Sequence, residues 1–287
     1  MNIKKPEVYR FEGATPGTNL VILGAIHGDE ICGTIAIKKV ISEIKSGDLV
    51  IESGSVTLIP ISNPQAYIEK KRFITDNLNR FFKKWDKADS YEKQLANFLT
   101  DYVEQADYML DIHSTTAEGE PNIFVDFNTP ENKAFAQVLP AQYAIFDWPQ
   151  LYKDQGEEIS SFDTTTHADN VGTHGVLLEC GQHNDPESAE RAYKAILNTL
   201  SYLKITADKH EKQSKLIEIF MKDLFIKRDI NDKLSREWQH LDTIKKGELL
   251  ATSVELGDII ASYDGYMILP KMNHPVGTEW FYLGKTN

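Results

Sequence analysis

Cysteine is scarce in this sequence of 287 residues, and its scarcity limits the chemistry that the protein can use. The two cysteines, Cys32 and Cys180, lie in separate apolar segments and do not form a C-x-x-C pair. This distribution argues against a disulfide framework and against a cysteine-rich structural metal site. We expect both thiols to be buried and free, as is usual in a reducing compartment.

Long hydrophobic runs are missing as well. No stretch approaches the roughly 20 apolar residues that cross a bilayer. The opening segment, MNIKKPEVYRFEG, lacks the apolar core of a secretory signal. From these absences we expect a cytoplasmic protein with no membrane partner.

Positive charge is in deficit, since 31 Lys and Arg residues face 43 Asp and Glu residues and give a formal net charge of −12. Such a chain repels nucleic acid phosphates and anionic lipid, so neither is expected as a general partner. The content of 41% hydrophobic and 26% charged residues is that of an ordinary globular protein.

Apolar runs alternate with amphipathic segments along the first two thirds of the chain. We expect strands at 20–26, 55–64, 108–116, 122–127, 143–148 and 175–181, and helices over 31–47, over 90–107 and after Asp185-Pro186. The polar region 150–175 is expected to be a long loop. This alternation predicts an α/β fold with a mixed, largely parallel sheet flanked by helices over residues 1–205. Short strand-like runs separated by glycines predict a small β-rich domain over residues 206–287.

Polar residues stand at the ends of three of these strands: His27, His113 and Glu179. Sites in open α/β sheets form outside the carboxyl ends of the strands. We therefore expect these distant residues to meet in space.

His27 and Glu30 are spaced so that one turn brings both side chains to the same side. With His113 they would form a set of two histidines and one glutamate, which holds catalytic zinc and leaves a position for water. The alternative is that Asp29 and Glu30 only favour a helix N-terminus, with His27 as a turn residue.

Two further acids belong to the same strand ends. Asp111 lies two residues before His113 and so faces the same side, where it would orient the imidazole. Glu179 ends an apolar strand and is interpreted as a general base, or alternatively as one partner of a salt bridge to Lys or Arg.

The segment RFITDNLNRFF, residues 72–82, combines Arg72 and Arg80 with Asn77 and Asn79. Two guanidinium groups in an acidic protein suggest that a carboxylate is bound here, because arginine pairs with carboxylates through two hydrogen bonds. A solvated basic loop is the alternative.

Taken together, GAIHGDE, NLNR, LDIHST and LLECG resemble, in order and spacing, four motifs of the succinylglutamate desuccinylase/aspartoacylase family within the zinc carboxypeptidase superfamily. The resemblance covers residues 20–182 and implies a carboxypeptidase-like catalytic domain. It implies one zinc ion bound by His27, Glu30 and His113. It further implies Glu179 as general base and proton donor, Arg72 as the group that polarises the scissile carbonyl, and Asn79 and Arg80 as the residues that hold a substrate carboxylate.

The chain departs from the family pattern twice. Asn77 stands where the family's Asp-Leu-Asn-Arg motif has its acid, so that charge is lost. Aspartoacylase itself uses another arginine, between the third ligand and the catalytic glutamate, for the side-chain carboxylate of its substrate, but this chain has no arginine between Arg80 and Arg191. Lys153 or His167 could replace it, or the side chain that is bound is not acidic. N-acetylaspartate is therefore not the substrate we expect.

We predict a zinc-dependent hydrolase that cleaves the amide bond of an N-acyl amino acid or a similar small amide with a free carboxylate. The alternatives are a metallocarboxypeptidase acting on peptides and, from another class, a metal-binding regulatory protein without catalysis. The sequence leaves the oligomeric state open, a homo-oligomer included.

Overall fold

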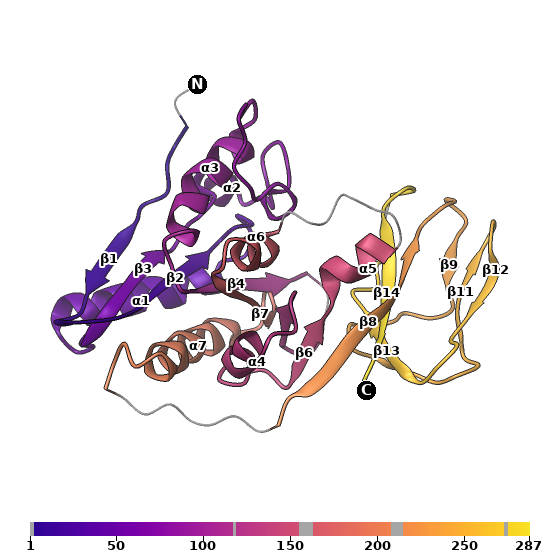
Figure 1. The fold of residues 1–287 in the computed structure, drawn as a ribbon. Coiled ribbons are helices and arrows are strands. Elements are labelled where there is room, and N and C mark those ends of the chain that lie inside the picture. The colour runs from indigo at the N-terminus through magenta and orange to yellow at the C-terminus, as the bar shows by residue number, and fades with distance from the viewer. Residues whose placement is uncertain (1–2, 117–118, 155–162, 208–214, 273–274) are drawn as a thin grey trace.

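An 11-stranded mixed sheet runs through the molecule in the order β1-β3-β2-β4-β7-β5-β6-β8-β14-β13-β10 (Figure 1). This computed structural model describes residues 3–116, 119–154, 163–207, 215–272 and 275–287. The strands of the sheet are β1 (Tyr9–Glu12), β2 (Thr15–Gly24), β3 (Ser53–Ile59), β4 (Tyr108–Thr115), β5 (Asn122–Val125), β6 (Tyr143–Phe146), β7 (His174–Gln182), β8 (Ile217–Ile226), β10 (Thr243–Ile244), β13 (Gly265–Ile268) and β14 (Glu279–Lys285).

Strands β3, β2, β4 and β7 pair in parallel, whereas β5 pairs with β7 in antiparallel orientation. A second, 3-stranded sheet has the order β12-β11-β9, formed by Gly257–Ile260, Leu249–Ser253 and Lys233–Leu234. The mixed α/β architecture with a β-rich C-terminal part is confirmed.

Helices cover both faces of the central strands (Figure 1). The helices are α1 (Cys32–Ser46), α2 (Pro64–Glu69), α3 (Tyr91–Val103), α4 (Pro130–Ala136), α5 (Trp148–Asp154), α6 (Thr164–Asn170) and α7 (Ser188–Tyr202), with a 3-10 turn, η1, at Leu78–Arg80. Alternate residues of β2 point to opposite faces of the sheet, and both faces are covered, so both are apolar. Leu20 and Ile22 belong to the core with α1, α4 and α7, whereas Val21 and Leu23 belong to the core with α3 and α6.

Local signals explain several element boundaries. Gly47 ends α1 in the left-handed conformation with φ 85°, as the sequence predicts. Asn63 caps α2 by accepting a hydrogen bond from the Ala66 N–H, and the preceding strand ends at Ile59, before the predicted end at residue 64. The helix after Asp185-Pro186 begins only at Ser188. Residues 185–188 form a turn in which the carbonyl of Asp185 accepts the Ser188 N–H.

The expected long loop over 150–175 is wrong in part. The end of α5 and the whole of α6 lie within it, and residues 155–162 are outside the described residues. Asp163 starts α6 by accepting the Thr166 N–H through its side chain. A helix as short as α6, which opens with three threonines, has little helical propensity of its own, so the sequence pattern does not reveal it.

The division into two domains at residue 205 stays a prediction. Strand β8 lies beyond residue 205 and pairs in parallel with β6, which lies before it. The sheet therefore continues from the N-terminal part of the chain into the C-terminal part. No helix in the described part of the chain is long and apolar enough to span a bilayer.

Candidate active site

The strand ends meet as expected, although His27 lies in a turn and not at the strand end itself. Strand β2 stops at Gly24, and Ala25 then adopts a positive φ of 48° that redirects the chain. The Glu30 N–H donates to the carbonyl of His27, so the His-x-x-Glu pair closes a turn before α1 begins. Gly28 is required in this turn, because a Cβ there would lie 2.1 Å from the carbonyl carbon of Ala66.

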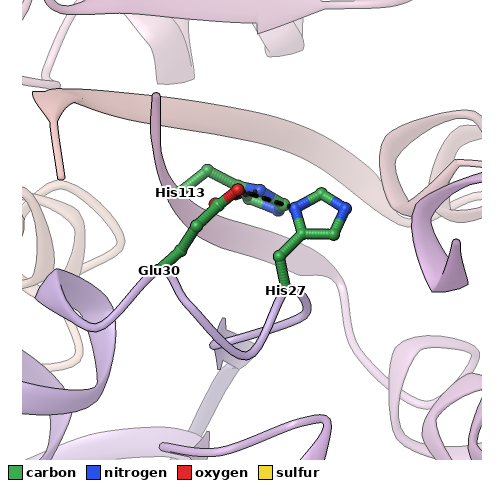
Figure 2. A group of neighbouring side chains, drawn as sticks. All are labelled: His27, Glu30 and His113. Carbon is green, nitrogen blue, oxygen red and sulfur yellow. Dashed lines mark hydrogen bonds and ion pairs between the residues drawn. The ribbon is translucent and has the colours of Figure 1, made fainter. Parts of the chain in front are cut away.

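The carboxylate of Glu30 lies between the two imidazoles (Figure 2). Its Oε1 is 2.8 Å from Nδ1 of His27, and its Oε2 is 2.9 Å from Nδ1 of His113. One ligand atom from each of these three residues lies within 4.8 Å of the others. All three side chains are 2% exposed.

The outer nitrogen of each imidazole lies close to a side-chain oxygen. Nε2 of His113 is 2.9 Å from Oδ2 of Asp111, and Nε2 of His27 is 2.9 Å from Oδ1 of Asn77. These contacts orient both rings with Nδ1 toward Glu30. Two imidazole nitrogens and one buried carboxylate are a donor set that suits a divalent transition metal, so the residues present fit a metal ion.

Burial and neighbouring charges keep Glu30 ionised and His27 neutral, as metal ligands must be. Burial acts to raise the pKa of Glu30, but the imidazoles of His27 and His113 hold it well below its ordinary value. Burial, followed by the positive charge of Arg72, lowers the pKa of His27 to about 4. Burial also acts to lower the pKa of His113, yet the carboxylates of Asp111 and Glu30 raise it well above its ordinary value.

Glu179 lies directly beside the third ligand, because His113 on β4 and Glu179 on β7 are register partners. Burial, and next the charge of Glu30, raises the pKa of Glu179 to about 7. Its Oε2 is buried and has no hydrogen-bond partner among the described residues. The alternative salt bridge to a lysine or arginine is not formed within this part of the chain.

A cavity joins these residues to the arginine segment. Its lining is contributed by side chains from several strands, from α6 and from the loops around them: His27, Arg72, Asn79, Arg80, His113, Phe124, Asp126, Trp148, Asp163, Thr165, Leu177, Glu179 and Leu269. The predicted catalytic and substrate-binding residues therefore share one space with the two histidine ligands. Leu269 follows β13, so the C-terminal part of the chain contributes to the lining of this cavity.

The two arginines differ in their surroundings. Nη1 of Arg72 donates to Oε1 of Glu30 at 2.7 Å, while the side chain stays 45% exposed. Nη1 of Arg80 donates to the carbonyl of Asn79 at 2.7 Å. Burial acts to lower the pKa of Arg80, but the acidic groups around it, Tyr282 and Tyr152 first, raise it.

The loop that carries both arginines is held by Glu92, a residue that sequence reasoning does not single out. Glu92 is fully buried on α3 and accepts the backbone N–H groups of Ile74, Thr75 and Asp76. A glutamate in the first turn of an amphipathic helix is an ordinary feature, so the sequence offers no signal for this role. The solvated basic loop considered as an alternative does not describe a segment anchored in this way.

Neither suggested replacement for a further arginine lines the cavity. Lys153 is exposed on α5, and Nε2 of His167 is 3.5 Å from Glu104. His183 does not line the cavity but lies close to Glu30: its Nδ1 is 2.8 Å from Oγ of Ser114, and one of its ring nitrogens lies within 4.8 Å of carboxylate oxygens of Asp29 and Glu30. Both cysteines are buried and free, and Cys32 on α1 and Cys180 on β7 belong to the same hydrophobic core.

Comparisons with known proteins agree with this architecture. The catalytic domain of the Succinylglutamate desuccinylase/Aspartoacylase family matches residues 16–204. A solved succinylglutamate desuccinylase from Vibrio parahaemolyticus superimposes with a TM-score of 0.78 at 16% identity, covering 97% of this chain and 86% of the other. The ectoine utilization protein EutE (DoeB) from Ruegeria pomeroyi gives 0.76 at 21% identity, covering 97% and 88%. At these identities the likeness shows the fold.

Two curated relatives are similar over somewhat more than half of the chain. A probable aspartoacylase from Acaryochloris marina is 29% identical over 172 residues, which are 55% of this chain and 57% of that protein. A succinylglutamate desuccinylase from Vibrio campbellii is 27% identical over 176 residues, which are 57% of this chain and 49% of that protein. The matches thus span about half of each relative. From the family match over residues 16–204, the chain belongs to the succinylglutamate desuccinylase/aspartoacylase family.

Proposed function

We propose that the protein is a zinc-dependent hydrolase that cleaves the amide bond of a small N-acyl amino acid. One observation carries the proposal: Glu179, with a pKa raised to about 7 and an unpartnered carboxylate oxygen, lies beside the cluster of His27, Glu30 and His113. A carboxylate with a pKa near neutrality and no competing partner is suited to accept a proton and return it.

His27, Glu30 and His113 would hold the zinc ion. When bound there, zinc would supply Lewis acidity, which makes water more acidic and polarises a carbonyl oxygen.

The residues of the chain supply the remaining steps. Glu179 takes a proton from the attacking water and later gives it to the amine that leaves. The guanidinium of Arg72, exposed enough to meet substrate, stabilises negative charge that develops on the carbonyl oxygen. Arg80 and Asn79 bind the free carboxylate, which fixes the amide near Glu179.

The C-terminal part of the chain contributes Leu269 to the lining of the cavity, which supports small amides over peptides, because a residue there leaves less room for a long chain. This is the observation that favours a deacylase over a carboxypeptidase of the same superfamily.

The test uses purified full-length protein loaded with zinc. Hydrolysis of N-acetyl and N-succinyl amino acids is compared with hydrolysis of short peptides, before and after treatment with a chelator. Chelator-sensitive release of free amino acid from the N-acyl compounds is expected. Release from peptides alone would favour the carboxypeptidase, and release from neither would overturn the proposal.

A further inference from the structure

A buried asparagine, Asn122 at the start of β5, stands beside the general base, and the mechanism above does not use it. Glu179 on β7 has His113 as its register partner on one side and Asn122 on the other. Asn122 is 0% exposed. Its amide nitrogen, Nδ2, is buried and has no hydrogen-bond partner among the described residues, and the same is true of Oε2 of Glu179. A buried donor without an acceptor costs stability, so the amide needs an explanation.

Asn122 and Glu179 lie on the same face of the sheet. Side chains alternate between the two faces, and Phe124 on β5 and Leu177 on β7, each two residues away, line the cavity together with Glu179. Ile123, the residue next to Asn122, packs in the core on the opposite face.

The two unpartnered atoms are within reach of each other. Register partners in antiparallel strands have Cβ atoms about 4.5–5.5 Å apart. The amide nitrogen of Asn122 and the carboxylate oxygens of Glu179 extend beyond these Cβ atoms on the same face. Rotation of the Glu179 side chain is therefore enough to join them.

His240, from the C-terminal part of the chain, fixes which way the amide of Asn122 points. The backbone N–H of Leu269 donates to Nδ1 of His240 at 3.1 Å, so Nδ1 carries no proton. Burial lowers the pKa of His240 to about 4, so the ring is neutral and its proton is on Nε2. Nε2 therefore donates to Oδ1 of Asn122 at 2.9 Å. The reverse orientation of the amide would set two donors against each other, so its N–H groups are left for another acceptor.

The contact with His240 does not by itself account for an amide at position 122. It needs only an acceptor oxygen, which other side chains also offer without an N–H group. Asparagine adds a donor, and the carboxylate of Glu179 is the acceptor that the register places next to it.

We propose that Asn122 is a positioning residue, which donates the free N–H of its amide to the carboxylate of Glu179 and so holds the general base toward the attacking water. This inference rests on the proposed function. One carboxylate oxygen would bind the amide, and the other would accept the proton from water. A base held in one orientation has less freedom to lose in the reaction, so Asn122 should act on kcat and not on KM.

The experiment measures kcat and KM of zinc-loaded Asn122→Leu with the N-acyl amino acid that the wild type hydrolyses best. We expect kcat to fall by about 10- to 100-fold, the usual worth of one hydrogen bond to a charged group, and KM to stay within about threefold. In the background of Glu179→Gln the same substitution should lower kcat by less than about threefold, because no general base is left to hold. An equal loss in both backgrounds, or a rise in KM without a fall in kcat, would overturn the inference.

Asn132→Leu is the matched control. Asn132 is also fully buried beside a histidine, with its Oδ1 3.2 Å from Nδ1 of His174. Its Nδ2, however, already donates to the carbonyl of Phe127 and to Oδ1 of Asp169, and none of these residues lines the cavity. Asn132→Leu should lower the melting temperature while kcat stays within about threefold of the wild type.

Nuclear magnetic resonance tests the hydrogen bond without turnover and without a change at Asn122. The zinc-loaded wild type and Glu179→Leu are compared, both isotope-labelled on their asparagine side chains. The amide proton signal of Asn122 should move upfield in Glu179→Leu, because a hydrogen bond to a carboxylate deshields the proton, while the signals of Asn132 should stay in place. If no N-acyl compound is hydrolysed, the proposed function fails, whereas this signal still reports the contact. An Asn122 signal that does not respond to Glu179→Leu would overturn the inference.

Discussion

Oδ1 of Asn77 lies 2.9 Å from Nε2 of His27, so an amide oxygen takes the place beside this ligand that a carboxylate, Asp111, takes beside His113. The departure from the family motif therefore removes a charge but keeps the hydrogen-bond acceptor. The two imidazoles are oriented alike and differ in the basicity that their partners give them.

Replacing Asn77 with aspartate tests this difference. Asn77→Asp should tighten zinc binding by about tenfold, because a carboxylate makes the imidazole of His27 a stronger donor, and Asn77→Leu should weaken it by about 10- to 100-fold. Competition with a chromophoric chelator measures both. Asp76→Asn, a charge change at the neighbouring position, is the control and should leave the affinity unchanged, and equal affinities in all four proteins would contradict the argument.

Glu179→Gln should separate chemistry from metal binding. The variant should still bind one zinc ion per chain, since Glu179 is not one of the three clustered ligands. Its turnover should fall by about 10²- to 10⁴-fold, the usual contribution of a general base. Turnover close to that of the wild type would remove Glu179 from the mechanism.

The same variant should be more stable than the wild type when metal is absent. Glu179 has a folded-state pKa of about 7 against an ordinary value of 4.5, so the folded state binds its proton more tightly than the unfolded state. The wild type therefore loses stability as pH rises from about 4.5 to 7, and glutamine does not. At pH 8 we expect Glu179→Gln to raise the free energy of unfolding by on the order of 2 kcal/mol, and at pH 4.5 by nearly nothing. Urea titration of chelator-treated protein measures both values.

The sequence predicts where the site lies because His27, His113 and Glu179 are polar residues that end apolar runs of the sequence. Parallel pairing of β2, β4 and β7 then brings these ends together, and no finer knowledge of packing is needed. The α/β class follows from the same alternation of elements.

The approach of the two buried acids Asp126 and Asp163 could not be predicted in this way. Asp126 and Asp163 meet only because β5 runs antiparallel to β7 and because α6 forms over the sheet. Neither event has a local signal, since β5 is a four-residue strand and α6 opens with three threonines. The pairing of β8 with β6 is equally a matter of distant contacts.

Glu92 should control the arginine loop from a distance. Glu92→Gln replaces one of the two acceptor oxygens with an NH₂ donor, which then faces either the N–H of Ile74 or those of Thr75 and Asp76, so we expect a loss of about 2–3 kcal/mol in the free energy of unfolding. Because the loop carries Arg72 and Arg80, KM should rise more than kcat falls. Asp89→Asn, which removes only a surface ion pair with Lys93, should cost less than about 1 kcal/mol and leave KM unchanged. A variant of Glu92 with wild-type KM would show that the loop holds its shape without this residue.

Thr164 connects the metal ligands to the substrate residues. Its hydroxyl donates to Oδ2 of Asp111 at 2.6 Å, and its backbone N–H donates to Oδ1 of Asn79 at 3.0 Å. Thr164→Val removes only the first contact. Oδ2 of Asp111 then lacks the hydroxyl that holds it beside His113, so zinc binding should weaken by about tenfold. Thr164→Ser keeps the hydroxyl and should restore the affinity to within about threefold of the wild type.

The control for this pair is Thr173→Val. The Thr173 hydroxyl is also buried, but it donates to the carbonyls of Val103 and Ala106, away from the cavity. Thr173→Val should lower the melting temperature without changing zinc affinity, because a buried carbonyl that loses its donor costs stability wherever it lies. If Thr164→Val lowers only the melting temperature, as Thr173→Val should, then Asp111 holds His113 without help from α6. The link between the helix and the metal ligands would then have to be abandoned.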